Sequence, residues 1–394
     1  MEYMEFRFSL SGKPLEGKKT VCGVVGSGNL EVIIEANASC ETVFTIQTAV
    51  EHYKPVWKMV IGDFMTQNQP VGLNFTLNDN GATPAVVLLR LAQALEEFKG
   101  HYSMGNNYAE LDGRERIQIL LDKDSFTEWL ADEKLYSPYL AALNLPGEAD
   151  DGIIIGSGLL HKNKVLIASQ QKDFMGGAVG EIHGAKLTGL FKAAVKTQAK
   201  AVILLIDSGG VRLHEANAGE IAISETIRAV FEARQAGITT IGIICGKNGA
   251  FGGMGIISAC LDYLIINEIG RIGVSGPEVI QAVAGVKAFD SKDRALVWRV
   301  YGGKTRYLQD VVQSYVSSDV AEIRERLIAA LDKRVPLELH SMKQKHALLK
   351  KRFEETKGFQ EEGAYLNHIA PDYAVTLFDM DEKSFLQAVK NIKS

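Results

Sequence analysis

A series of apolar runs separated by helical patterns constrains the fold of this chain more than any other feature. The runs at 201–207, 238–245 and 263–267 are apolar along nearly their whole length, which is typical of strands buried on both faces of a parallel sheet. Parallel strands need long crossover connections, and the helical patterns between the runs supply them. From Asp151 onward the sequence therefore predicts an α/β unit with a largely parallel sheet. Its other expected elements are a strand at 164–169, helices at about 180–198 and 215–235, and a short helix starting near Gly253.

The N-terminal part of the chain has a different pattern. Short β-like runs alternate with turn residues, and a helix with a rough apolar stripe follows at 84–98. Residues 99–112 are polar and rich in Gly and Asn, which is typical of a linker. We therefore expect a small α+β domain at 1–98, a linker at 99–112 and a second domain at 113–394, in line with a length of 394 residues. The expected strands of the first domain lie at 21–25, 31–34, 42–47 and 72–77.

The charge and the cysteine content argue against several functions. A net charge of −5 without a dominant basic cluster gives no support for binding to nucleic acid or to a membrane surface. The four cysteines show no CxxC spacing, so we expect neither a zinc ribbon nor a disulfide framework, and no metal. No apolar stretch approaches the length of a membrane span and the N-terminus does not resemble a signal peptide, so the sequence predicts a cytoplasmic protein.

A run of basic residues near the C-terminus lies in a stretch with helical character. We interpret this run as a solvated helix face, and contact with an anionic cofactor or partner is the alternative. The run consists of Lys343, Lys345, Lys350, Lys351 and Arg352.

Two glycine pairs follow two of the predicted strands. Gly209 and Gly210 come after the first apolar run, and Gly252 and Gly253 lie in GAFGGMG after the second. Ligands of α/β folds bind at the carboxyl ends of strands, and glycines there let the backbone approach an oxygen closely. A following helix N-terminus adds positive potential. We therefore expect the N–H groups of these glycines to face a developing oxyanion, although glycine pairs also occur simply in tight turns.

Two side chains beside the first glycine pair are candidates for substrate or cofactor binding. Arg212 can pair with a carboxylate or a CoA phosphate, and a structural salt bridge is the alternative. His214, like His183, can donate a proton, but a lone histidine more often only forms a hydrogen bond. The sequence contains no Walker, GxGxxG or GxSxG motif, and its His214-Glu215 pair lacks the second histidine of HExxH. Nucleotide binding, a hydrolase triad and a zinc protease are therefore unsupported.

A single serine between two glycines marks the N-terminal domain. Ser27 lies in VVGSGNLEVII, residues 24–34, at a predicted turn. Taken alone, such a serine is usually a turn residue. Its hydroxyl is also a group to which a carrier arm can be attached, and this is the functional alternative.

The second domain resembles the β-type half of the acyl-CoA carboxyltransferase family, a branch of the crotonase-like superfamily. The resemblance rests on GGAVGEIHGAKLTGLFKAAV, LLIDSGGVRLHEANAG, CGKNGAFGGMGI and RIGVSGPEVI. It implies the β-β-α superhelix of crotonase-like proteins. GVRLHEAN, FGGMGI, GPEVI and FDSKDRALVW are most similar to the β subunit of malonate decarboxylases. The segment from Val211 through LHEAN departs from the usual pattern of biotin-dependent relatives, and the zinc ribbon of acetyl-CoA carboxylase β subunits is absent.

The first domain independently resembles the acyl-carrier (δ) subunit of the malonate decarboxylase family. GSGNLEV and NDNGATPAVVLLRLAQALEEF carry this resemblance. It implies that Ser27 is esterified to 2′-(5″-phosphoribosyl)-3′-dephospho-CoA, whose thiol holds the acyl group. No biotinylation motif is found, so no biotin is expected on this chain. The two subunits are usually separate chains, and Met104-Gly105 stands where the β subunit would begin in a gene fusion.

Together the two resemblances imply a carboxy-lyase subunit that fuses the acyl carrier and the β subunit of malonate decarboxylase. A malonyl thioester would lose CO₂ to give the acetyl thioester, through an enolate that backbone N–H groups stabilise. The implied partners are a γ subunit that completes the site, an α subunit that acts as acyl-carrier transferase, a prosthetic-group transferase and a malonyl-loading enzyme.

Other functions fit the same residues. The chain can instead be the carboxyltransferase subunit of a biotin-dependent malonate decarboxylase, which passes the carboxyl group to biotin on another protein. It can also be a non-catalytic scaffold that tethers the arm while the γ subunit does the chemistry. A stand-alone hydratase or isomerase fits less well, because an enzyme for free CoA esters has no use for a carrier domain.

Overall fold

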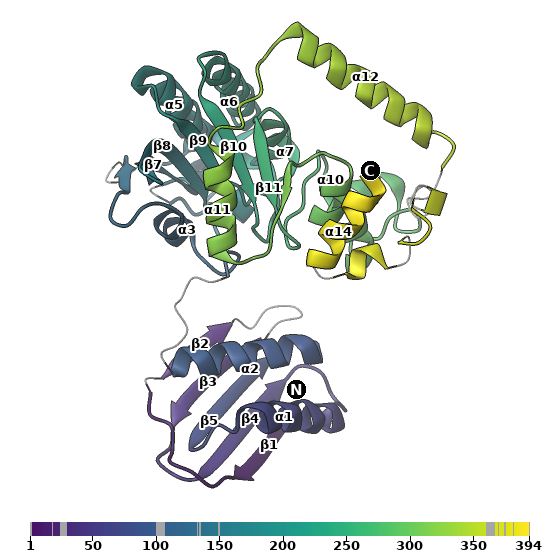
Figure 1. Ribbon diagram of the computed structural model, residues 1–394. Coiled ribbons are helices and arrows are strands. Elements are labelled where there is room, and N and C mark those ends of the chain that lie inside the picture. The colour runs from purple at the N-terminus through teal and green to yellow at the C-terminus, as the bar shows by residue number, and fades with distance from the viewer. Residues whose placement is uncertain are drawn as a thin grey trace. The chain divides into compact units, whose positions relative to one another are not determined.

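The chain forms two compact units, Met1–Met104 and Gly105–Ser394 (Figure 1). The computed structural model describes residues 2–17, 19–23, 30–99, 107–131, 133, 135–148, 150–359, 367–368, 370–373, 376–380 and 382–393. Both units are mixed α/β structures, as the sequence predicts.

The first unit is a five-stranded sheet with the order β1-β4-β5-β3-β2 and two helices. Its elements are β1 (Glu2–Ser9), β2 (Thr20–Gly23), β3 (Leu30–Ala36), β4 (Glu41–Thr48), α1 (Lys54–Asn68), β5 (Leu73–Asp79) and α2 (Pro84–Phe98). Strands β4 and β5 pair in parallel, and the other neighbours pair antiparallel. Alternate residues of β4 are buried, and Figure 1 shows both helices on the same face of the sheet.

Helix α2 has the bounds that the sequence predicts, but α1 and β1 were not expected. The buried residues of α1 include Trp57, Val60, Ile61 and Phe64, which recur at the helical spacing of three and four. Gly62 and the β-branched residues in this segment weaken its helix propensity, so the packed apolar face accounts for the helix.

The second unit is built on a seven-stranded sheet with the order β12-β11-β10-β9-β8-β7-β6. The strands are β6 (Thr127–Trp129), β7 (Ile153–Leu160), β8 (Asn163–Gln170), β9 (Ala201–Leu205), β10 (Thr239–Ile244), β11 (Tyr263–Ile266) and β12 (Ser314–Tyr315). From β8 to β12 all neighbours pair in parallel, and β7 pairs antiparallel with both β8 and β6. The expected parallel sheet is therefore present.

Helices cover both faces of this sheet, so that it forms the middle of three layers (Figure 1). Val202 and Leu204 of β9 pack in one apolar cluster with α5 (Glu181–Thr197) and α6 (Asn217–Gln235). Ala201, Ile203 and Leu205 pack in a second cluster with α3 (Gly113–Leu120) and α11 (Val320–Ala330). Alternate side chains of β9 thus point to opposite faces of the sheet, and both faces are buried. This explains why the sequence of β9 is continuously apolar.

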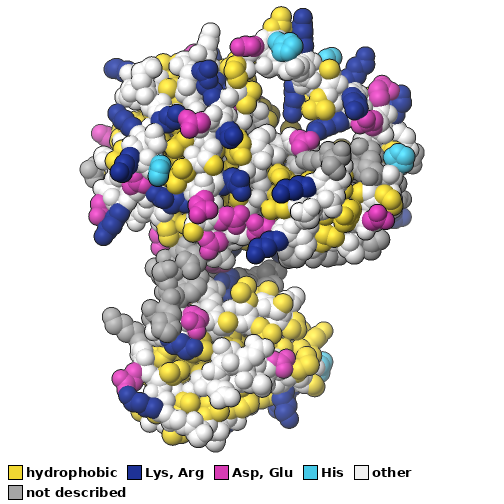
Figure 2. Space-filling view, viewed as in Figure 1, with side chains coloured by type: hydrophobic (Ala, Val, Ile, Leu, Met, Phe, Trp, Pro, Cys, Tyr) yellow, Lys and Arg dark blue, Asp and Glu magenta, His cyan; other side chains and the backbone are white. Residues whose placement is uncertain are grey.

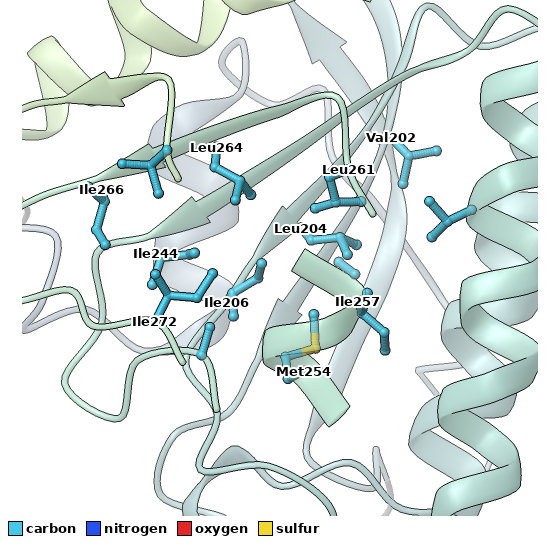
Figure 3. Close-up of a cluster of buried hydrophobic side chains, with 14 of the residues drawn as sticks. Val202, Leu204, Ile206, Ile244, Met254, Ile257, Leu261, Leu264, Ile266 and Ile272 are labelled. Atoms are coloured by element: carbon cyan, nitrogen blue, oxygen red, sulfur yellow. The ribbon is translucent and has the colours of Figure 1, made fainter. Parts of the chain in front are cut away.

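The apolar residues of a short helix, α7 (Gly252–Ala259), pack against the edge of the sheet. Met254 and Ile257 of α7 belong to the same cluster as Ile206, Ile244 and Leu264, and Figure 3 shows these side chains together. This packing fixes where the N-terminus of α7 lies relative to the ends of β9 and β10.

The expected linker at 99–112 is too long, because its second half is part of the second unit. Tyr108 and Leu111 are buried in the cluster that covers one face of the sheet. The guanidinium of Arg116 lies 4.7 Å from the centre of the Tyr108 ring, and Tyr108 N–H donates to Ser318 O at 3.0 Å. The polar composition of the segment concealed these contacts.

The remaining helices are distributed along the second unit. They are α4 (Pro138–Ala142), η1 (Met175–Gly177), η2 (Leu213–Glu215), α8 (Pro277–Ala284), α9 (Arg294–Tyr301), α10 (Gly303–Leu308), α12 (Leu339–Thr356), η3 (Leu377–Asp379) and α14 (Glu382–Lys393). Within the described ranges, none of the helices combines the length and the apolar character needed to span a bilayer.

Candidate active site

The loops after the parallel strands pair with one another beyond the carboxyl edge of the sheet. Val179 bridges Val211, Ser208 bridges Ala250, and Ala250 bridges Ile272, each in parallel register. These bridges join the loops that follow β8, β9, β10 and β11 into one row. The two glycine pairs of the sequence lie in this row, one in residues 207–211, which we name the first glycine turn, and one in residues 249–253, the second glycine turn.

The two glycine turns are in contact. A Cβ built on Gly252 would lie 3.1 Å from Gly210 Cα and 3.6 Å from Val211 N. Gly210 has φ +136° and Gly252 has φ +54°, values that side-chain-bearing residues rarely adopt. Glycine is therefore required here both by the backbone conformation and by the close approach of the two turns.

The first glycine turn uses its N–H groups within the chain. Gly209 N–H donates to Gly176 O at 2.9 Å, and Gly210 N–H donates to Ser208 Oγ at 3.2 Å. Both N–H groups therefore have an acceptor within the chain. One bond joins two loops and the other lies within the first glycine turn, as buried backbone groups require.

The second glycine turn keeps some donors available. Gly252 N–H donates to Val274 O at 2.8 Å, so this N–H too has an acceptor within the chain. Gly253 and Met254 occupy the first turn of α7, where N–H groups have no partner within the helix. Among the described residues no acceptor is found for these two N–H groups or for that of Val211. The donors that face the contact between the turns are thus Val211 and the positive end of α7.

Arg212 forms structural salt bridges, the alternative to substrate or cofactor binding that the sequence left open. Its guanidinium is buried and forms ion pairs with Asp151 at 2.7 Å and Glu215 at 2.9 Å. It also donates to the carbonyl oxygens of Ala178 at 3.1 Å and Asp151 at 2.8 Å. These contacts direct the guanidinium into the chain, so Arg212 fixes the loop after the first glycine turn.

A buried histidine adjoins this ion group. The backbone N–H of His183 donates to Asp151 Oδ2 at 2.8 Å. In its side chain, Nε2 lies 3.2 Å from the side-chain amide nitrogen of Gln170. Burial lowers the pKa of His183 well below 6.5, and the charges of Arg212 and Lys186 lower it further. Burial also raises the pKa of the Asp151 carboxyl, an effect that the hydrogen bond and ion pair with Arg212 oppose.

His214 stands apart from these buried contacts. His214 lies in η2 and is exposed to solvent, next to Leu213, of which 82% is exposed. Ser27 lies outside the described residues.

A second buried ion pair, which the sequence did not predict, lies at the start of the first glycine turn. Asp207 Oδ2 accepts from Arg116 at 2.8 Å, and both side chains are buried. Asp207 Oδ1 accepts from Asn248 N–H at 2.6 Å, and Gln170 Oε1 accepts from Asp207 N–H at 2.9 Å. Asp207 therefore ties the loops after β8, β9 and β10 together. An acidic residue at the end of a buried strand signals that a partner must exist, but sequence alone does not identify Arg116 as that partner.

An open groove of about 850 Å³ lies between α5 and α6, next to the buried ion group. Small residues line much of the groove. They are Gly184, Ala185 and Gly189 on α5 and Ala218 and Ala222 on α6. The other residues that line the groove are Tyr139, Glu181, Thr188, Lys192, Ala216, Asn217, Ile221 and Glu225.

The fold and the paired glycine turns define the class of protein, an α+β carrier domain joined to a crotonase-like carboxyltransferase domain. Residues 17–98 match the family described as the malonate decarboxylase delta subunit (MdcD), and residues 101–382 match the carboxyl transferase domain. The chain therefore belongs to the carboxyl transferase family and carries at its N-terminus a domain of the malonate decarboxylase delta subunit family.

Individual relatives agree with this assignment. The chain is 35% identical over 242 residues to the malonyl-S-ACP:biotin-protein carboxyltransferase MADC of Malonomonas rubra, which covers 58% of this chain and 76% of that protein. It is 41% identical over 101 residues to the malonate decarboxylase acyl carrier protein of Acinetobacter calcoaceticus, which covers 25% of this chain and 99% of that protein.

A solved structure agrees as well. The crystal structure of a Pseudomonas malonate decarboxylase hetero-tetramer in complex with malonate matches with a TM-score of 0.61 and 31% identity, over 66% of this chain and 94% of the matched chain. The similarities show a fused acyl-carrier and carboxyltransferase-like subunit of the malonate decarboxylase type.

The buried His183 predicts a loss of stability in acid. Its pKa in the folded chain is below the unfolded value of about 6.5, so the unfolded state binds the proton more readily. The contribution of His183 is complete above pH ~6.5 and is lost as the pH falls, with a slope of up to about 1.4 kcal/mol per pH unit. We expect His183→Gln to flatten the acid side of the stability curve measured by urea unfolding.

The exposed His214 supplies the matched control, because His214→Gln also removes one imidazole. An acid slope that is the same in His183→Gln and in the unmodified chain contradicts this account of His183.

Proposed function

We propose that this chain is the fused acyl-carrier and β subunit of a malonate decarboxylase and that it converts a malonyl thioester to an acetyl thioester and CO₂. The observation that carries the proposal is the contact between the two glycine turns, at a site in the same chain as a carrier domain. The N–H groups of Val211, at the first glycine turn, and of Gly253 and Met254, in the first turn of α7, have no acceptor among the described residues.

These N–H groups suit the charge that the reaction creates. When a malonyl thioester loses its carboxylate as CO₂, negative charge develops on the thioester oxygen. Fixed N–H donors and the N-terminus of α7 stabilise this charge without having to reorganise. Loss of one such donor typically lowers turnover by about 100-fold or more. The buried ion group of Arg212 supports the reaction indirectly, by holding the loop after the first glycine turn.

The carrier domain offers a reason to expect a phosphodiester-linked arm. Ser27 follows β2, whose last residue, Gly23, pairs with Glu31 of β3. The match of this domain to the malonate decarboxylase delta subunit family, and to the acyl carrier proteins among its relatives, supports a prosthetic group on a serine. We propose that Ser27 holds a phosphoribosyl-dephospho-CoA group, whose thiol would bind the acyl group as a thioester.

A partner subunit is part of this proposal. The match to the carboxyl transferase domain accounts for one such domain, residues 101–382, and the Pseudomonas relative is described as a hetero-tetramer. We propose that a γ subunit completes the site and that the groove between α5 and α6 faces it. His214, exposed beside the start of α6, is a candidate to donate the proton to the product. An α-type transferase, a malonyl-loading enzyme and a prosthetic-group transferase would supply the loaded arm.

The substitution Gly252→Ala tests the site. Its methyl group would enter the contact between the turns and would impose a side chain at φ +54°, which would displace the neighbouring N–H donors, so we expect the rate of CO₂ release from malonate to fall by about 100-fold. The control is Gly285→Ala, which also has a left-handed φ of +86° but has no atom within 4 Å of the new methyl group. Equal activities of the two variants in intact complexes would indicate a scaffold without catalytic function.

Transfer of the carboxyl group to biotin is the second candidate function. The name of the Malonomonas rubra relative, a malonyl-S-ACP:biotin-protein carboxyltransferase, favours it. In that reaction the carboxyl group would pass to a biotin on another protein and would not leave directly as CO₂. Avidin, which sequesters biotin, separates the two functions. We expect avidin to leave CO₂ release by the native complex unchanged, and its inhibition by avidin would establish the biotin-dependent reaction instead.

A further inference from the structure

Helix α12 is a long helix that makes few contacts with the other described elements of its own unit. No residue of α12, from Leu339 to Thr356, is buried. Figure 1 shows it running outside the layers formed by the sheet and the helices of the second unit. Most of the stability of helices in proteins comes from an apolar face that packs against something else. A packing surface for α12 is therefore expected from outside this unit.

The apolar residues of α12 follow the spacing of a coiled-coil seam. Counting Leu339 as position a of a heptad, the a and d positions are separated by alternating steps of three and four residues. The residues at these positions are Leu339, Met342, His346, Leu349, Phe353 and Thr356. The four apolar members are each more than half exposed, between 51% and 68%.

Basic residues flank this seam on both sides. The e positions hold Lys343 and Lys350, and the g positions hold Lys345 and Arg352. Arg352 also contacts Asp310 of its own unit at 2.7 Å, whereas the three lysines have no ion-pair partner in the part of the chain that the structure describes. In Figure 2 dark-blue basic and yellow apolar side chains gather over this helix.

The acidic residues of α12 lie off the seam. Glu354 and Glu355 fall at positions b and c, where they pair with Lys357 and Lys351. The acidic residues thus lie away from the apolar stripe, whereas four of the basic residues lie beside it and only Lys351, at position f, does not. Heptad positions e and g select the charge of a partner helix in a coiled coil.

We propose that α12 is a docking helix for an amphipathic helix of a different protein, one that carries apolar residues at its a and d positions and Asp or Glu at its e and g positions. The basic flanks exclude a second copy of this chain as the preferred occupant. In either a parallel or an antiparallel pair of α12 helices, lysine would face lysine or arginine across the seam, and such like-charge contacts oppose pairing.

An anionic membrane fits the pattern less well than a helix does. Helices that lie in a membrane interface have a broad apolar face, whereas α12 has a narrow a/d stripe with a histidine in its middle. A partner helix covers such a stripe fully, and its acidic flanks pair with the lysines that have no partner in this unit.

The test uses the full chain and a fluorescent synthetic peptide of about three heptads, with Leu at positions a and d and Glu at positions e and g. A second peptide has Lys in place of Glu, and vesicles of equal parts phosphatidylcholine and phosphatidylglycerol represent a membrane. We expect the Glu peptide to bind in a salt-dependent manner and the Lys peptide to bind at least about tenfold more weakly.

Two neighbouring leucines provide matched variants, because both are exposed on α12 and alanine preserves the helix. Leu349→Ala removes a residue of the seam and should weaken binding of the Glu peptide by about tenfold, whereas Leu348→Ala, at position c, should leave it unchanged. Equal effects of the two substitutions, or equal binding of both peptides, would overturn the proposal. Binding to the vesicles without binding to the Glu peptide would also overturn it, in favour of a membrane.

Discussion

The loops of the candidate site depend on one buried guanidinium. Arg212 needs both of its carboxylate partners, because an unpaired charge in the interior costs several kcal/mol. Each partner is in turn fixed by the backbone of α5: Glu215 accepts from Glu181 N–H, and Asp151 accepts from His183 N–H. The ion group therefore links the start of β7, the loop after β9 and the first turn of α5. Without it, the row of bridges that brings the two glycine turns together would lose its support on one side.

Much of the architecture was predictable because it depends on local patterns. Continuously apolar runs predicted the parallel sheet, since β9 and its neighbours are buried on both faces. Pro84 and the apolar stripe after it predicted α2 with its observed bounds. Helix α1 was missed because its helical propensity is weak and its apolar face becomes clear only when packed on the sheet. Residues 107–112 were assigned to a linker because polar composition does not reveal that Tyr108 packs under Arg116.

The candidate site was predictable in its location but not in its hydrogen bonds. Glycine pairs after two adjacent parallel strands must lie at the same sheet edge, so their contact follows from the topology. Which N–H groups remain available depends on pairing between loops, and the sequence does not encode that pairing locally. Gly209, Gly210 and Gly252 donate within the chain, whereas Val211 and the first turn of α7 retain donors. The buried pair of Arg116 and Asp207 joins residues far apart in the chain and shows no sequence signal of its own.

The central claim is that one chain both carries the acyl group and contains the site that acts on it. The most direct measurement is the mass of the Ser27 peptide from the protein purified from its native host during growth on malonate, with the peptide of the exposed Ser39 as an internal control. The account predicts that the Ser27 peptide alone carries the added mass of a phosphoribosyl-dephospho-CoA group, with or without an acetyl or malonyl group. A bare Ser27, in a host that makes the attachment enzymes, would contradict the account and leave a carboxyltransferase domain joined to a domain that carries nothing.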